Sequence, residues 1–554
     1  MRQTTLCVPL EVKPESYDRL TALIDTLRRA EDFAGDPARP NFQRIFQSVP
    51  TLHFLSMSVF PGHDYDPIFI VEANFDGPPG PFWGQIESLL SDALRPMIRC
   101  CKRPFDGTGD LYDAVTAVDG RSPAVAFLEA NTQLPSVFHH GNRGLDRNRI
   151  LADHALFLAA RAELDDPART GASPYRSGRA ADVHRTLRAA LLPCFAWLAD
   201  PAPPRITTAE RAVNFIRLIR FVVIALLVLS LPGLLLAPLM SWQLYLIVTA
   251  VCATVAFALI WKYRHAIAGT EVAARVKLKP PSIVRLLFIA AVVILYAAAA
   301  TTLLGLAVGV IHYISLAAAG LSIGRTIAWG PALGTTFRAV ILGLASILVT
   351  LPVLILIVRW NELRDSHQDA PPVDDAVLRE MVRREDWIMQ NHMGSIVLIK
   401  PGILRTVIIR AGHYGLGLFL RATAISGYLG SMRTVHFAHW AFLNNSSRLL
   451  FLSNFDHSWG SYLDDFIEKS HAGLTLAWGA GVGFPRTRML VLDGASHGRQ
   501  FKTWALASRS VSRFWYSAYR DLTVDQIERN YRLATGLRRA SLTEDEAIAW
   551  AWDL

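Results

Sequence analysis

The sequence is poor in cysteine, with five in 554 residues. Cys100 and Cys101 are adjacent and form no CxxC pattern, and Cys252 lies in an apolar run. A disulfide framework is therefore not expected, and this usage is typical of a reduced cytoplasmic compartment. The first residues, MRQTTLCVPLEV, lack the apolar core of a signal peptide. We therefore expect the N-terminal domain to stay inside the cell.

Several signatures of catalysis and nucleic-acid binding are also missing. The sequence contains no Walker loop, HExxH or GxSxG. The glycine-rich run 479–483 follows a predicted helix rather than a strand, which argues against a dinucleotide-binding loop. The net charge is +9, yet no dense Lys/Arg tract is interleaved with aromatic residues. This basic balance predicts anionic lipid headgroups as partners and no nucleic acid.

Charge is absent from four long stretches in the middle of the chain. They cover residues 221–240, 242–261, 286–311 and 339–358, and none contains Asp, Glu, Lys, Arg or His. Each has about the 20 residues that an α-helix needs to cross a hydrocarbon core. We therefore predict an α-helical membrane block of four transmembrane helices within residues 211–360, surrounded by the lipid bilayer.

The basic residues around these stretches predict their orientation. Lysine and arginine are frequent before the first stretch, between the second and third, and after the fourth. Between the third and fourth stretches the only such residues are Arg325 and Arg338. The positive-inside rule predicts a multi-pass protein of a bacterial-type inner (plasma) membrane, with both termini and the 262–285 loop in the cytoplasm. Pro232 and Pro352 predict kinks. Residues 312–337 are either an interfacial or re-entrant piece or a loop.

The N-terminal region, residues 1–200, has the pattern of a small α+β module. Alternation predicts a strand at 5–12, and further apolar runs predict strands at 52–60, 68–75 and 135–139. Amphipathic helices are predicted after the first and third strands. This β-α-β-β-α-β order is the ferredoxin-like plan.

The C-terminal region, residues 375–540, repeats that plan, with strands predicted at 395–400, 434–442, 449–455 and 512–517. Five landmarks recur in the same order: Val12-Lys13-Pro14 with Ile399-Lys400-Pro401, His53-Phe54 with His436-Phe437, Asn74-Phe75-Asp76 with Asn454-Phe455-Asp456, Trp83-Gly84 with Trp459-Gly460, and Val118-Asp119-Gly120 with Leu492-Asp493-Gly494. The last landmark predicts short strands at 116–119 and 489–493. The recurrence predicts an internal duplication.

Two of the predicted strands are apolar on both faces. Residues 68–71 and 449–452 do not alternate, so a second layer must bury the face that the helices leave open. The most economical second layer is the other module's sheet, which predicts a pseudo-dimeric α+β barrel within one chain. Homodimeric pairing, giving a homo-oligomer, and packing on the membrane helices are the alternatives.

The pairing of two such modules resembles the dimeric α+β-barrel superfamily, which includes dye-decolorising peroxidases and chlorite dismutase-like proteins. The run from Ile399 to Asp456 also resembles a group of uncharacterised membrane-linked proteins. The peroxidase resemblance implies haem as a cofactor and a Gly-x-x-Asp-Gly motif. Only its last two residues are present, at Asp119-Gly120 and Asp493-Gly494, with Thr116 and Leu490 in place of the first glycine. The resemblance supplies no proximal haem ligand.

The recurring histidines are the candidate functional residues. Strand alternation places His436 on the same face as Trp440, with His439 on the opposite face. An imidazole that faces a barrel cavity can bind haem or another ligand, or carry a proton. The alternative is a hydrogen-bonded core histidine, and for Asp456 it is a helix cap or an Asx turn. The candidate catalytic residues are His436, His53, Asp456 and Asp493; the candidate cofactor-binding residues are His436, Trp440 and Tyr516; no set of metal ligands is expected.

Two classes of function follow from the sequence. The first is a membrane-tethered α+β barrel that binds a small ligand or haem for redox chemistry, with peroxidase-like activity if it is an enzyme. The second is a non-catalytic membrane scaffold or assembly protein whose barrel is solid core. A transporter is less expected, because the apolar stretches contain no charge to form an ion or proton path.

Overall fold

The computed structural model describes residues 3–32, 42–62, 65–118, 122–166, 175, 178–263, 282–318, 333–365, 373–385, 389–423 and 432–554. The chain forms two compact units. Unit 1 contains residues 1–208, 368–485 and 495–554, and unit 2 contains residues 209–367 and 486–494. The N-terminal and C-terminal regions, predicted as separate modules, therefore fold together in unit 1.

The first sheet of unit 1 is antiparallel, with the strand order β1-β3-β2-β11. Its strands are β1 (Gln3–Glu11), β2 (Leu52–Phe60), β3 (Ile68–Asp76) and β11 (Ser512–Ser517). Three strands belong to the N-terminal region, whereas β11 comes from the C-terminal region and pairs with β2.

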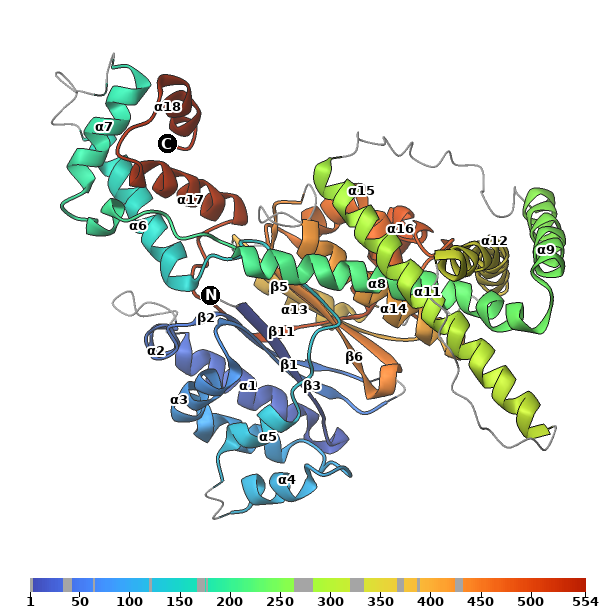
Figure 1. Ribbon diagram of the computed structural model, residues 1–554. Helices are drawn as coiled ribbons and strands as arrows, with labels where there is room; N and C mark the ends of the chain where they lie inside the picture. The colour runs from blue at the N-terminus through green and yellow to red at the C-terminus, as the bar shows by residue number, and fades with distance from the viewer. Residues whose placement is uncertain are drawn as a thin grey trace. The chain divides into compact units, whose positions relative to one another are not determined.

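The second sheet has the order β10-β5-β7-β6-β4. Figure 1 labels two of its strands, β5 and β6. Its strands are β4 (Val137–His140), β5 (Gln390–Leu398), β6 (Val435–Leu443), β7 (Arg448–Asp456) and β10 (Arg509–Ser510). Here β4 of the N-terminal region pairs with β6 of the C-terminal region. Each sheet thus takes one edge strand from the other region of the chain.

The strand exchange links the two sheets at both edges. Residues 509–517 pair first with β5 of the second sheet and then with β2 of the first. At the other edge, Gln133 bridges Cys7 of β1, and residues 137–140 pair with β6. The path from one sheet to the other is therefore continuous on both sides.

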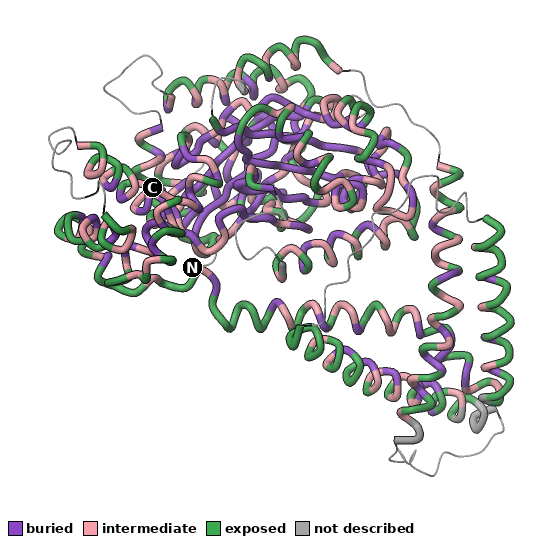
Figure 2. Tube along the Cα trace, turned by 90° about the horizontal axis from the view of Figure 1, so that it is seen from above, coloured by how far each residue is buried: buried purple, intermediate pink, exposed green. Residues whose placement is uncertain are grey.

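The two sheets pack face to face within one chain. A buried apolar cluster joins side chains of both sheets: Cys7, Phe60, Ile68, Ile70, Ile396, Ala441, Leu443, Leu450 and Leu452. Figure 2 shows the middle of the sheet unit largely in purple, the colour of buried residues. In each sheet, the face that is not covered by helices is therefore buried against the other sheet.

The helices of unit 1 form two groups. In the N-terminal region they are η1 (Pro14–Ser16), α1 (Tyr17–Glu31), α2 (Gln43–Ser48), α3 (Pro79–Arg99), α4 (Gly109–Thr116), α5 (Ala124–Ala130), α6 (Arg147–Leu164), α7 (Ala180–Leu191) and η3 (Ala196–Ala199). In the C-terminal region they are α13 (Asp375–Glu385), α14 (Ile403–Thr423), η5 (Asn444–Ser446), α15 (Trp459–Trp478), η6 (Gly494–Ser496), α16 (Gly498–Ala507), α17 (Val524–Arg538) and α18 (Glu544–Ala551). Large outer cores join the sheets to helices that include α1, α3, α15 and α16. In contrast, α6, α7, η3, α17 and α18 pack on one another around a core of their own.

Unit 2 consists of long apolar helices and one short hairpin. Its elements are α8 (Thr208–Leu236), η4 (Ala237–Leu239), α9 (Trp242–Lys262), α11 (Ile283–Ala318), α12 (Leu333–Leu363), β8 (Thr487–Arg488) and β9 (Leu492–Asp493). Five helices in the described chain are long and apolar enough to cross a membrane: α8, α9, α11 and α12, and also α14 of unit 1. Their length and composition indicate a membrane protein.

The proline in α8 is accommodated by side chains of α12. Near Pro232, the Gly233 N–H donates to Ser346 Oγ at 3.1 Å. The Leu229 carbonyl accepts from Thr350 Oγ1 at 2.7 Å. A Cβ at Gly233 would lie 2.4 Å from the Cβ of Ser346, so only glycine permits this approach. Hydroxyls of α12 thus bond backbone groups of α8 beside the proline.

The hairpin of unit 2 is held by the end of α12. The Glu362 carboxylate accepts the backbone N–H groups of Met489 and Leu490, both at 2.9 Å, and the hydroxyl of Thr487 at 3.0 Å. Met489 and Leu490 have φ values of 54° and 67°, which turn successive N–H groups toward one acceptor. This hairpin replaces the strand predicted at 489–493.

Three other predictions differ from the structure. The strand predicted at 116–119 fails at Thr116, which ends α4, and the rest of that landmark includes Asp119, outside the described residues. Strand β5 begins at Gln390, before the predicted start at 395, because its polar first residues are buried between the sheets. Of residues 312–337, the described parts at 312–318 and 333–337 continue α11 and α12.

Candidate functional site

A layer of buried polar side chains lies at one end of the space between the sheets. His53 lies at a register shift of β2, and His436 lies at the equivalent shift of β6. Such β-bulges re-aim a side chain relative to simple alternation. Both imidazoles are fully enclosed, with residue exposures of 0% and 1%.

The first histidine is fixed at both ring nitrogens. Nε2 of His53 lies 3.0 Å from Oδ2 of Asp76, and Nδ1 lies 2.8 Å from the hydroxyl of Tyr519. The same Asp76 oxygen accepts the backbone N–H of Arg147, the first residue of α6, at 2.9 Å. Asp76 therefore joins the imidazole to the start of the helix that follows β4.

The second histidine repeats this arrangement. Nε2 of His436 lies 2.7 Å from Oδ1 of Asp456. Oδ2 of Asp456 accepts the backbone N–H of Val524, the first residue of α17, at 2.8 Å. The sequence offered two roles for Asp456, a partner of His436 or a helix cap. In the structure Asp456 has both roles. The helix it caps is not the next in sequence but the one that follows the exchanged strand β11.

A buried carboxylate links the two sheets between these pairs. Oε2 of Glu72 on β3 lies 2.9 Å from Nε2 of His392 on β5, and Oε1 lies 3.4 Å from Nδ1 of His439 on β6. Glu72 also accepts hydrogen bonds from Ser56 and Asn74, each at 3.0 Å. Burial raises the pKa of Glu72, but the hydrogen bonds and charges of the two histidines outweigh it and hold the pKa well below its usual range.

Burial controls the protonation of the other groups in this layer. The pKa of His140 is lowered well below its usual value by burial and then by the neighbouring His53 and His139. Burial and the nearby Asp76 raise the pKa of Tyr519 well above its usual value. His140 is therefore a neutral imidazole and Tyr519 a protonated phenol, and each supplies a fixed hydrogen-bonding group.

Two predicted cofactor residues lie away from His436. Trp440 belongs to the outer core of the second sheet and packs against Trp478, with ring centroids 5.6 Å apart. Tyr516 belongs to the outer core of the first sheet, beside Phe42 at 5.9 Å. The prediction that His436 shares a face with Trp440 is therefore wrong, because the β-bulge at residues 435–437 interrupts the alternation between them.

Asp493 also lies outside this layer. It is in the hairpin of unit 2, where Oδ1 accepts a hydrogen bond from the Arg488 guanidinium at 3.0 Å. The structure thus brings together three of the candidates, His53, His436 and Asp456, and separates Asp493 from them.

Sequence reasoning missed the centre of the polar layer. Glu72 is a charged residue within the apolar strand Ile68–Asp76, and alternation places it on the same face as Asn74 and Asp76. A carboxylate in a strand that is otherwise buried was the signal available. Nothing comparable marks His392 or Tyr519, because their positions depend on the pairing of distant strands.

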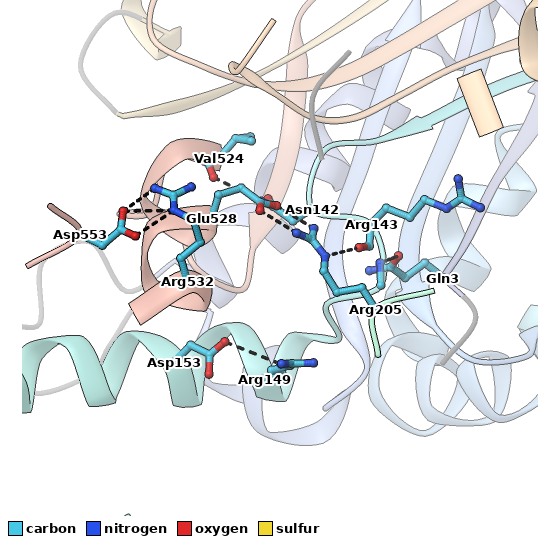
Figure 3. Close-up of polar contacts among 11 residues, drawn as sticks. Gln3, Asn142, Arg143, Arg149, Asp153, Arg205, Val524, Glu528, Arg532 and Asp553 are labelled. Atoms are coloured by element: carbon cyan, nitrogen blue, oxygen red, sulfur yellow. Dashed lines mark hydrogen bonds and ion pairs between the residues drawn. The ribbon is translucent and has the colours of Figure 1, made fainter. Parts of the chain in front are cut away.

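A second polar cluster anchors the segment that leads into α8 (Figure 3). Both carboxylate oxygens of Glu528 on α17 accept hydrogen bonds from Arg205, at 2.7 Å each. Asn142 donates to the same carboxylate at 2.9 Å, and Arg205 Nε donates to the Arg143 carbonyl at 2.9 Å. This bidentate pair fixes the last part of unit 1 before the apolar helices.

His53 does not fit the haem that the peroxidase resemblance implies, and His436 is enclosed by aromatic rings. A haem ligand needs a ring nitrogen free to face the iron. Both nitrogens of His53 are hydrogen-bonded. Nε2 of His436 is bonded to Asp456, whereas its buried Nδ1 has no hydrogen-bond partner among the described residues. The ring of His436 lies against Phe54 and Tyr519, with centroids 5.5 and 6.0 Å away. Within the described residues, no group of three His, Cys, Asp or Glu side chains is placed to hold a metal ion.

Comparison with known proteins gives no relative. No family model, no curated protein and no solved structure matches the chain. The site is therefore interpreted from its own geometry.

Proposed function

We propose that the chain is an integral protein of a plasma (inner) membrane, in which α8, α9, α11 and α12 cross the bilayer and both termini are cytoplasmic. The lysine and arginine asymmetry around the apolar stretches supports this orientation. The ends of α9 and α12 line one groove, so the chain leaves both helices on the same side of unit 2. An even number of crossings requires this arrangement.

The fifth apolar helix, α14, is assigned to the sheet unit. It packs against β4 and α15. His413 of α14 is buried, and its Nε2 lies 2.9 Å from the Ala477 carbonyl. Arg405, Arg410 and Arg421 add charge that the apolar stretches at 221–240, 242–261, 286–311 and 339–358 lack.

Reporter fusions test the orientation. Fusions after residues 200, 270 and 370 are expected to report a cytoplasmic location, and a fusion after residue 325 an external one. A cytoplasmic reading after residue 325 would contradict four crossings.

For the sheet unit, we infer that two ferredoxin-like halves arose by duplication and form a pseudo-dimeric α+β barrel. The strand orders β1-β3-β2 and β5-β7-β6 support this proposal, as do the equivalent bulges at His53 and His436. The resemblance to the dimeric α+β-barrel superfamily remains part of the proposal.

The function that this geometry supports best is that of a non-catalytic membrane scaffold or assembly protein. One observation carries the proposal: Asp76 and Asp456 each bind a histidine and the first N–H of a helix that follows an exchanged strand. Each aspartate thereby fixes, within its own region, the helix that follows the strand given to the other sheet, and His53 contacts Tyr519 of the C-terminal region. Ligand or redox chemistry at His436 is the competing function.

An absorbance spectrum and one variant separate these functions. The purified full chain is expected to show no Soret band. His436→Ala is expected to lower the free energy of unfolding by about 1–3 kcal/mol, since the buried Asp456 oxygen loses its donor. A Soret band that disappears in a stable, folded His436→Ala variant would support the redox function instead.

A further inference from the structure

The ends of α9 and α12 form an apolar groove in unit 2. Its volume is about 380 Å³. The lining residues are Leu259, Tyr263, Leu356, Ile357, Arg359, Trp360 and Leu363. Only Arg359 among them is charged, and its guanidinium is bonded to Glu362 at 3.1 Å and to the Thr487 carbonyl at 3.2 Å. The groove is therefore lined mainly by aliphatic side chains and aromatic rings. Its one charged residue, Arg359, is bonded to Thr487 of the hairpin.

Several apolar and aromatic side chains of this groove are about half exposed, which is unfavourable in water. Trp360 is 56% exposed, Leu363 is 51% exposed and Tyr263 is 50% exposed. Tryptophan and tyrosine gather where membrane helices leave the hydrocarbon core, because their rings are apolar and their N–H or O–H groups are polar. The groove thus has the composition of the headgroup boundary of a bilayer.

Two cations lie at the rim of the groove. Lys262 precedes Tyr263, and its Nζ lies 5.5 Å from the centroid of that ring. The guanidinium of Arg364 lies 3.9 Å from the ring centroid of Trp360. Among the described residues, neither cation has a carboxylate within ion-pair distance. Positive charge beside an apolar groove complements a lipid with an anionic headgroup.

We propose that this groove binds one phospholipid with an anionic headgroup. An acyl chain lies along Leu259, Leu356 and Ile357, and the headgroup phosphate lies between Lys262 and Arg364. The proposal rests on the proposed membrane location of α9 and α12 and adds a specific lipid site to it. The bound lipid would also contact Arg359, which holds the hairpin at Thr487.

The test uses the full chain in dodecyl maltoside. Native mass spectrometry measures the binding of phosphatidylglycerol and of phosphatidylcholine with the same acyl chains. The wild-type chain is expected to retain one phosphatidylglycerol and to bind it roughly tenfold or more tightly than phosphatidylcholine, because two cations contact its headgroup. Equal retention of the two lipids would overturn the proposal.

Two variants locate the site. Lys262→Gln with Arg364→Gln is expected to remove the preference for phosphatidylglycerol. The matched control is Arg211→Gln with Arg217→Gln, which removes two exposed cations from α8 outside the groove and is expected to keep the preference. If the rim variant binds phosphatidylglycerol as the wild type does, the site is not there.

A third variant fills the groove without changing its charge. Ile357→Trp is expected to abolish the retained lipid while the protein keeps the melting temperature of the lipid-free wild type. A wild-type chain that is dimeric and free of lipid, and becomes monomeric with Ile357→Trp, would identify the groove as an interface between copies and overturn the proposal. Carbonate extraction of membranes separates failure of the lipid site from failure of the membrane location. A chain that stays in the membrane but retains no lipid refutes only the lipid site. A chain that carbonate extracts refutes the membrane location as well.

Discussion

Oδ2 of Asp76 lies 2.9 Å from the backbone nitrogen of Arg147, 71 residues further along the chain. A helix cap is usually supplied by the residue just before the helix. Here α6 has such a local cap in Asp146, and Asp76 satisfies a further N–H from the end of a neighbouring strand. The start of α6 is therefore fixed to the sheet, and the equivalent contact of Asp456 fixes α17.

We expect Asp76→Ala and Asp456→Ala to destabilise unit 1 by roughly 2–6 kcal/mol each. Each change leaves a buried imidazole nitrogen and a helix N–H without an acceptor, at about 1–3 kcal/mol per group. Urea unfolding followed by tryptophan fluorescence measures the effect. Asp456→Asn keeps one acceptor oxygen and serves as the milder control. A loss below about 0.5 kcal/mol for both alanine variants would show that these contacts do not hold the helices.

Glu72 should make the sheet unit sensitive to acid. Its pKa is held below the ordinary 4.5 in the folded state, so its contribution to stability is present above about pH 4.5 and is lost as the pH falls further. Glu72→Gln is expected to be less stable at neutral pH and to lose less stability on acidification below that point. Melting temperatures recorded between pH 3 and pH 7 give both slopes, and parallel slopes would contradict this role.

Asp153 should make the stability of the protein fall, instead of rise, as the pH increases toward 7. Burial raises the pKa of this carboxyl to about 7, despite Arg149 at 3.8 Å (Figure 3). Because the folded state binds this proton more tightly, the cost of ionisation is absent below about pH 4, grows as the pH rises and is complete above about pH 7. Asp153→Asn should therefore stabilise the protein above pH 7, by up to about 4 kcal/mol, and have little effect at pH 4. A variant no more stable than wild type at pH 8 would disprove the raised pKa.

The strand exchange can be trapped by a disulfide. Ser58 of β2 and Ser512 of β11 are cross-strand partners, so Ser58→Cys with Ser512→Cys brings two thiols together. The experiment is done with the exposed Cys194 and Cys252 changed to serine. Oxidation is expected to give a faster-migrating monomer on a non-reducing gel. A covalent dimer would mean that β11 pairs with β2 of another chain.

Local pattern was sufficient for most elements of the fold. The strands at 52–60 and 512–517 were predicted at their observed limits, because their apolar runs end at turn residues. The polar start of β5 was not predicted. Polar residues such as Gln390 indicate a loop, and their burial becomes clear only from the other elements that pack against them. Which edge β4 and β11 join cannot be read from alternation, because the pairing depends on residues hundreds of positions away.

The candidate site was predictable in its residues more than in its arrangement. The recurrence of His53 and His436 identified the two histidines, and Asp456 was a separate candidate. Asp76 was only part of a recurring landmark, because its proximity to His53 is not visible in the sequence. The bulges that interrupt the alternation beside these two histidines leave no mark in the sequence. Glu72 was visible as a charge in a buried strand, but its histidine partners come from the other sheet.

The exchanged strand β4 also sets the order of events on the ribosome. Ser136, beside β4, donates its backbone N–H to Trp440, 304 residues later. At about 5–20 residues per second, translation needs roughly 15–60 s to reach that partner. During this interval β4 has no partner strand, because the four apolar helices within residues 208–363 are synthesised before β6. The second sheet can therefore be completed only after these helices have been made.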